Sequence, residues 1–255
     1  MSNTGSAEAE QHRNIRQAEQ AWQKKASLRS VYGGLYAALK SRIPADGKIL
    51  EIGAGSGHSR DFFSGMDITR LDILPGPWVD MVADAHDIPV PDESFDAIVM
   101  LDVLHHLADL PKFFAEVCRI LRPGGRCVMI DPGITPISGA FYRAFHEEPV
   151  DMSVDPMTRQ SYGPNKDPFD SNQALPTLLF AVRRYREQFQ QQFPDLKVVE
   201  TRRISLFAYP MSGGFQPWSL LSGSTARALL KLESVLEPVL GRLMAFRILA
   251  TIQKR

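Results

Sequence analysis

A glycine-rich segment that follows a predicted strand constrains the fold of this chain more than any other feature. The apolar run at 48–52 (KILEI) leads directly into GAGSG, with glycines at positions 53, 55 and 57. Glycine adopts backbone conformations that other residues rarely adopt, and its missing Cβ lets a ligand approach the main chain. The N-terminus of a short helix expected at 58–64 offers N–H groups to an anionic group. The segment therefore predicts an α/β fold that binds a ligand where its first strand ends.

Strands and helices alternate after this segment. Further strands are expected at 69–73, 79–83, 95–101 and 126–131, with an amphipathic helix at 110–121. In the later half we expect a helix at 176–193 and strands at 196–209 and 244–253. Such alternation is typical of a parallel sheet with right-handed crossovers. We therefore expect a doubly wound, mostly parallel seven-stranded sheet whose last strand is antiparallel.

Three parts of the chain lie outside this regular pattern. Residues 1–45 are expected to form an N-terminal helical lid region, broken at Gly33-Gly34, and residues 46–255 to form the main domain. Insertions at 132–172 and 210–241 interrupt that domain, and we expect them to complete the lid. Both insertions are longer than loops without secondary structure or function usually are.

Composition narrows the possible functions. The chain has 255 residues with 29 basic and 29 acidic side chains, so it lacks the basic excess typical of nucleic-acid-binding proteins. Its two cysteines do not make a disulfide framework. No apolar run reaches the ~18 residues expected of a membrane span, and the first residues do not resemble a secretory signal. We therefore expect a cytoplasmic protein that binds no nucleic acid.

The spacing of the glycines excludes two common nucleotide-binding loops. A dinucleotide fingerprint needs glycine at the first, third and sixth positions, and the sixth position counted from Gly53 is His58. A phosphate-binding loop would need Lys in place of His58. A nicotinamide-dependent dehydrogenase is therefore disfavoured.

Acidic residues follow three of the predicted strands. Asp72 lies nineteen positions after Gly53, where a carboxylate can accept hydrogen bonds from both hydroxyls of a ribose. The alternative is that Asp72 only caps the turn before Pro75, and we favour ribose because the loop and the acid occur together. Asp84 could accept from an adenine amine or cap nearby amides, and Asp102 ends the strand at 95–101. The carboxyl ends of parallel strands are where open α/β sheets bind ligands.

Four segments carry a family resemblance. The segments ILEIGAGSGHSRDFF, TRLDI, VADAHDIPVPDESFDAIVMLDVLHHLADL and EVCRILRPGGRCVMIDP resemble, in order and spacing, the motifs of class I S-adenosylmethionine-dependent methyltransferases of the type 11 small-molecule group. The resemblance covers about a third of the chain. It implies a Rossmann-like fold, S-adenosyl-L-methionine as cofactor, and methyl transfer to a small molecule or to a glycan- or lipid-linked precursor. The alternative function is that of a catalytically silent binding module with the methyltransferase fold.

The resemblance also implies roles for single residues. The backbone of Gly53, Ala54 and Gly55 would line the methionine part of the cofactor. Glu51 would hold this loop or reach the amino group through water, and the Leu101 carbonyl would face the amino-acid end.

The same resemblance places the adenosine part of the cofactor. Asp72 would take the ribose hydroxyls, with Ile73 against the adenine, and Asp84 and the Ala85 amide would read the edge of the ring.

Methyl transfer from a sulfonium needs a base only if the acceptor loses a proton during attack. His106 is our first choice for that base, although His105 and His106 can each be interpreted as helix-start histidines bonded to backbone. His146, Glu147, Glu148, Asp151 and Asp155 share no recognised metal-ligand spacing and suggest a solvated acidic loop. We therefore expect no metal site.

A helix expected at 225–243 has an unusually wide apolar face, and Pro238 should kink it or divide it in two. The face could pack onto the sheet, form a homodimer, or contact a membrane. The polar residues of this helix are Arg227, Lys231, Glu233, Glu237 and Arg242, which are mixed in sign. Since mixed charges weaken attraction to a membrane, we rank packing first, a homodimer second and membrane contact third.

Overall fold

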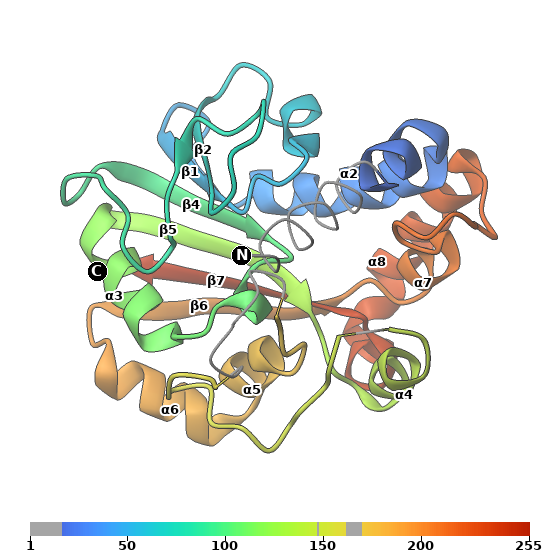
Figure 1. Ribbon diagram of the computed structural model, residues 1–255. Coiled ribbons are helices and arrows are strands. Elements are labelled where there is room, and N and C mark those ends of the chain that lie inside the picture. Colours follow the sequence, from blue (N-terminus) through green and yellow to red (C-terminus); the bar gives the residue numbers. More distant parts are fainter. Residues whose placement is uncertain (1–16, 147, 162–169) are drawn as a thin grey trace, which may run out of the picture.

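A twisted seven-stranded sheet lies at the centre of the molecule, with helices on both faces (Figure 1). The computed structural model describes residues 17–146, 148–161 and 170–255. The strand order is β3-β2-β1-β4-β5-β7-β6, and only β7 runs antiparallel to its neighbours. The strands are β1 Lys48–Ile52, β2 Asp67–Asp72, β3 Met81–Val82, β4 Phe95–Leu101, β5 Leu121–Pro132, β6 Leu196–Ile204 and β7 Arg247–Lys254. The predicted doubly wound α/β fold is therefore confirmed.

The helices connect the strands and cover the sheet. They are α2 Ala26–Lys40, α3 Leu110–Ile120, α4 Pro136–Phe145, α5 Leu175–Ala181, α6 Arg183–Gln192, α7 Ala208–Ser212 and α8 Gly223–Met244, with 3-10 helices η1 His58–Asp61 and η2 Leu104–His106. Residues 17–24 are also helical. No helix among the described residues is long and apolar enough to cross a membrane.

Alternating side chains of the strands feed two separate cores. Leu50 and Ile52 of β1 point to the face covered by α3, α5 and α6, whereas Ile49 points to the face covered by α2. A strand buried on both faces is apolar over most of its length, which is why β4 reads FDAIVML, with only the partly buried Asp96 charged. The amphipathic α3 begins at its cap Asp109, whose side chain accepts a hydrogen bond from the Lys112 amide at 2.9 Å.

The predicted helix break at Gly33-Gly34 is wrong, because α2 continues through both glycines. A Cβ added at Gly33 would lie 3.1 Å from the Phe62 ring, and one at Gly34 would lie 3.6 Å from Leu230. Gly33 therefore allows the Phe62 ring to approach α2 closely, whereas a Cβ at Gly34 would make only an ordinary contact.

Several predicted boundaries also need correction. The helix expected at 58–64 is only the 3-10 helix η1, and the helix expected at 176–193 is divided at Val182, whose backbone is extended. The strand expected at 196–209 stops at Ile204, since Ser205 adopts a φ of 66°. In α8 the chain stays in a single helix through Pro238 instead of forming two.

The end of β5 depends on close backbone contact with β7, which gives a stability prediction. A Cβ at Gly133 would lie 2.8 Å from the carbonyl carbon of Arg247 and 3.0 Å from the Ile248 nitrogen. Because backbone atoms cannot move aside as a flexible side chain does, we expect Gly133→Ala to lower the free energy of unfolding by about 1–3 kcal/mol. Urea denaturation followed by circular dichroism measures the change.

Gly76→Ala is the matched control, since its Cβ would meet only Val79 at 3.4 Å. We expect it to change stability by less than about 0.5 kcal/mol. Equal stability of the two variants would contradict the close packing of β5 on β7.

Candidate functional site

A cavity of about 450 Å³ opens at the carboxyl ends of β1, β2 and β4. This volume lies within the range of small-molecule sites. Parallel pairing brings these strand ends to one edge of the sheet. The cavity brings together seven of the residues predicted to form the site: Gly53, Gly55, Asp72, Ile73, Asp84, Ala85 and His106.

The three loop glycines serve different purposes. Gly53, Gly55 and Gly57 all have positive φ, at 77°, 50° and 71°. A Cβ at Gly53 would collide with Val103, and one at Gly57 would collide with Trp78, so these two positions serve internal packing. At Gly55 an added Cβ would meet nothing within 4 Å, and Gly55 lines the cavity. The open side of Gly55 therefore fits a ligand that approaches the main chain.

Asp72 ties the glycine loop to the end of β2. Its Oδ2 accepts a hydrogen bond from the Gly55 amide at 2.8 Å, and its Oδ1 accepts one from the Leu74 amide at 3.0 Å. Asp72 therefore does cap the turn before Pro75, as its alternative role required. Each carboxylate oxygen can accept more than one hydrogen bond, and Asp72 also lines the cavity. Ribose binding by Asp72 stays a prediction.

Asp84 and Ala85 lie on the same cavity wall, beyond β3. Asp84 Oδ1 accepts from the His86 amide at 2.9 Å and lies 2.6 Å from His86 Nδ1. Partial burial opposes ionisation, but the hydrogen bonds from His86 lower the pKa of Asp84 below its ordinary value. The side chain is therefore an anion that caps its own loop and is also exposed to the cavity. Its contact with adenine, like that of Ala85 and Ile73, stays a prediction.

Three predicted residues lie beneath the cavity surface: Glu51, Ala54 and Leu101. Glu51 is 5% exposed, and its Oε2 accepts from Ser59 Oγ at 2.6 Å and lies 3.5 Å from Arg70 Nε. Burial raises the pKa of Glu51 to about 7. Of the two roles predicted for Glu51, these contacts fit the one in which it holds the glycine-rich loop. The Ala54 amide donates to the Leu71 carbonyl at 3.1 Å, and the side chain of Leu101 packs against the core on the α2 face.

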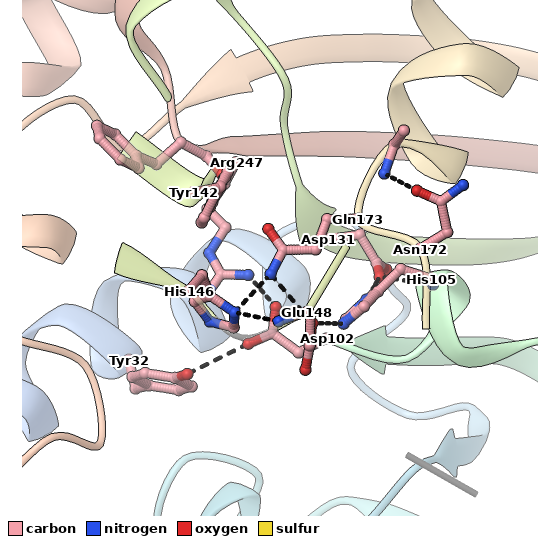
Figure 2. A network of polar contacts seen from close by, with 12 residues as sticks. Tyr32, Asp102, His105, Asp131, Tyr142, His146, Glu148, Asn172, Gln173 and Arg247 are labelled. Carbon is pink, nitrogen blue, oxygen red and sulfur yellow. Dashed lines mark hydrogen bonds and ion pairs between the residues drawn. The ribbon is translucent and has the colours of Figure 1, made fainter. Parts of the chain in front are cut away.

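Asp102 connects the cavity to Arg247, a buried cation that was not among the predicted site residues. Asp102 lines the cavity, accepts a hydrogen bond from the Tyr32 hydroxyl at 3.2 Å, and forms an ion pair with Arg247 (Figure 2). Arg247 is 2% exposed, with its guanidinium carbon 4.1 Å from the ring centroid of Tyr209. A cation inside an apolar strand such as MAFRILATIQ must have an anionic partner, so the sequence could have marked Arg247 as a buried, paired cation without naming its partner.

His105 is held between two carboxylates (Figure 2). Its Nδ1 lies 2.7 Å from Asp131 Oδ1 and its Nε2 lies 3.4 Å from Glu148 Oε2. Burial alone would lower the pKa of His105, but hydrogen bonds to these two carboxylates raise it to about 9. The interpretation of His105 as a helix-start histidine bonded to backbone is therefore wrong. At neutral pH it is an imidazolium that joins η2 to β5 and to the insertion.

His105, His106 and Glu148 are the described residues grouped closely enough to suggest a metal site. One ligand atom from each lies within 4.8 Å of the others. In the sequence, Glu148 was considered as a metal ligand only together with the other residues of its own loop. Glu147 lies outside the described residues. The expectation of no metal site stays a prediction.

Residues 50–129 match the protein family described as "Methyltransferase domain". Demethylmenaquinone methyltransferase of Symbiobacterium thermophilum is 25% identical over 95 residues, which are 36% of this chain and 35% of that protein. Phthiotriol/phenolphthiotriol dimycocerosates methyltransferase 1 of Mycobacterium ulcerans is 31% identical over 116 residues, 38% of this chain and 42% of that protein. The chain thus covers well under half the length of these relatives.

A solved structure of a SAM-dependent methyltransferase from Archaeoglobus fulgidus shares the fold. It is 14% identical, with a TM-score of 0.53, and the match covers 89% of this chain and 94% of that one. This likeness confirms the fold, and the family match confirms the predicted methyltransferase domain.

The position of Asp72 in the cavity predicts the effect of removing its carboxylate. We expect Asp72→Ala to weaken binding of S-adenosylhomocysteine by roughly 2–4 kcal/mol, because two charge-assisted hydrogen bonds to the ribose would be lost. Isothermal titration calorimetry measures the affinity. Asp80→Ala is the control, since Asp80 also accepts a backbone N–H (Arg70, 2.8 Å) but does not line the cavity. If both variants bind as the wild type does, Asp72 does not hold the ribose.

The environment of His105 predicts how stability depends on pH. Because its folded-state pKa is raised from 6.5 to about 9, its stabilisation is complete below pH 6.5 and is lost as pH rises through 9. A shift of this size corresponds to roughly 3 kcal/mol. We expect the free energy of unfolding of the wild type to fall by up to that amount between pH 6.5 and 10. In His105→Gln, denaturant titrations should show a smaller fall, and equal falls in both proteins would contradict the assignment.

Proposed function

Because residues 50–129 of this chain are a class I S-adenosylmethionine-dependent methyltransferase domain, we propose that the protein methylates a small lipophilic molecule or a lipid-linked precursor. The observation that carries the proposal is the cavity at the carboxyl edge of the sheet, where the open side of Gly55 meets the carboxylates of Asp72 and Asp84. The acceptor class rests on the two relatives, whose names refer to a menaquinone precursor and to dimycocerosates.

The cavity walls offer a place for each part of the cofactor, which when bound supplies an activated methyl group on a sulfonium. We assign the ribose hydroxyls to Asp72 and the adenine amine to Asp84, because anionic acceptors suit both groups. The methionine end belongs beside Gly53, Gly55 and the end of β4. Here the protein mainly positions the reactants and excludes water.

The acceptor side of the site belongs to the parts that we assign to a lid: residues 1–45, 132–172 and 210–241. Tyr32 of α2 reaches Asp102 at the cavity, and Arg159 of the first insertion lines the cavity itself. Lys25 Nζ donates hydrogen bonds to the carbonyl oxygens of Gly214 and Gln216 at 2.6 and 2.8 Å. These contacts connect the N-terminal region to the second insertion, and Arg159 brings the first insertion to the cavity, which supports a cover over the site built from all three parts.

His106 is our proposed general base for an acceptor that must lose a proton. It lines the cavity, whereas His105 holds protons between two carboxylates and cannot accept another at neutral pH. Glu148 lies close to both histidines, and its negative charge stabilises an imidazolium formed at His106. A ring nitrogen of His106 would take the proton that the acceptor loses as it receives the methyl group.

The base assignment predicts a separation between turnover and binding. We expect His106→Ala to lower kcat by about 10²–10⁴-fold while calorimetry shows unchanged affinity for S-adenosylhomocysteine. The deficit should shrink as pH rises, because the acceptor then ionises unaided. His106→Gln, which keeps the size of the side chain but cannot take the proton, should behave in the same way. Full turnover of both variants at every pH would mean that catalysis here is positioning alone.

The proposed activity is tested by transfer of a labelled methyl group from S-adenosylmethionine to demethylated quinols, phenolic lipids and a lipid extract of the source cells. We expect product only with lipophilic acceptors and none with Asp72→Ala at low cofactor concentration. Cofactor binding without transfer to any acceptor in a broad metabolite extract would favour the binding-module alternative. Loss of transfer on adding a chelator, with recovery on adding magnesium, would contradict the metal-free mechanism.

A further inference from the structure

The outer face of α8 carries a stripe of large apolar side chains exposed to solvent. Leu232, Val235, Val239 and Leu243 are 52%, 72%, 78% and 49% exposed. They recur at steps of three and four residues, so they share one face of the helix. With 22 residues, α8 is about 33 Å long, and it lies at the periphery of the molecule beside α2 and α4 (Figure 1). Packing onto the sheet, ranked first from the sequence, therefore does not account for these four side chains.

The acidic residues of α8 face the interior of the protein. Glu233 is 1% exposed and accepts hydrogen bonds from the backbone amides of Phe207 and Ala208. The side chain of Glu237 is 12% exposed and accepts from the Ser205 amide at 3.0 Å and from Arg202 at 3.2 Å. Both carboxylates are therefore occupied by the segment around α7 and do not contribute to the charge of the outer face.

The charges that α8 exposes to solvent are all positive. Arg227, Lys231 and Arg242 are exposed, and the helix contains no acidic residue besides Glu233 and Glu237. The five charges of this helix are mixed in sign in the sequence, but the fold turns the two anions inward, so the mixture does not weaken attraction to a membrane. An apolar stripe flanked only by Lys and Arg is the pattern of a helix that lies in a membrane interface.

We propose that the outer face of α8 docks on the surface of an anionic lipid bilayer. The helix would lie parallel to the membrane plane, with Leu232, Val235, Val239 and Leu243 at the acyl boundary. Arg227, Lys231 and Arg242 would contact lipid phosphates, since long basic side chains can reach the headgroups while their stems stay in apolar surroundings. This surface lies outside the cofactor cavity, and its binding to lipid does not depend on the proposed methyl transfer.

A second copy of the chain is a poorer occupant of this face. In a twofold-symmetric dimer the same patch is buried on both copies, so one interface would hold the cations of both α8 helices. The exposed surface of α8 offers no carboxylate to neutralise them. An anionic bilayer satisfies both the apolar stripe and the positive charges.

Flotation with lipid vesicles tests the proposal on the full-length protein without acceptor or cofactor. We expect binding to vesicles of phosphatidylcholine with phosphatidylglycerol, and much weaker binding to phosphatidylcholine alone. Val235→Asp/Val239→Asp should reduce the bound fraction by about tenfold or more, because two apolar side chains can no longer enter the interface. Arg227→Gln/Lys231→Gln/Arg242→Gln should remove the preference for anionic vesicles, and added salt should do the same to the wild type.

Two control variants match these changes elsewhere on the surface. Val82→Asp places a charge at a valine that is 54% exposed on β3, and Arg183→Gln removes a cation whose side chain is 91% exposed on α6. Both should bind vesicles as the wild type does, and thermal unfolding should show that all variants are folded. Failure of the wild type to bind, equal binding to both kinds of vesicle, or a dimer in sedimentation velocity that Val235→Asp/Val239→Asp dissociates would overturn the proposal. A failed methyl-transfer assay would leave the vesicle result unchanged.

Discussion

The parallel pairing of β1 between β2 and β4 is the constraint on which the site depends. In register, Ile52 of β1 lies opposite Leu71 of β2 and Met100 of β4, so the three strands end together. The glycine loop, Asp72 and Asp102 then meet at one edge, although about fifty residues separate the first from the last. The amides of Gly53 and Ala54 both donate to the Leu71 carbonyl, and Asp72 accepts from Gly55, so the loop is part of the sheet edge and not a separate flap.

Buried charges fasten the irregular parts of the chain to this edge. Asp102 at the end of β4 joins Arg247 of β7 and Tyr32 of α2, and His105 joins Asp131 of β5 to Glu148 of the first insertion. Removing charges from water is costly unless each finds its partner, so these contacts form as complete sets or not at all. Because Asp102 also lines the cavity, the packing of Tyr32 and Arg247 against it is coupled to the shape of the site.

The surface of α8 follows from the needs of the backbone beneath it. The chain leaves β6 at Ser205 with a positive φ and enters the short α7, whose first amides have no partners within the helix. Glu233 accepts from the amides of Phe207 and Ala208 at the start of α7, and Glu237 accepts from the Ser205 amide just before it, so both carboxylates are drawn inward. The only charges left on the exposed face of α8 are therefore cations. The positive charge of this face follows from the hydrogen bonds that hold the two glutamates inside.

The sequence by itself determined the sheet, the glycine loop and the family. Apolar runs such as 48–52 and 95–101 coincide with β1 and β4, because a strand buried on both faces can be little else. Short-range patterns could not predict that α2 would pass through Gly33-Gly34, or that Glu148 and Arg247 would reach the site. The sequence spacing between Asp102 and Arg247, or between His105 and Glu148, contains no information about which partner each finds. The tertiary structure decided those pairs, and the inward turn of the α8 glutamates, because burial forces each charge to the nearest group able to satisfy it.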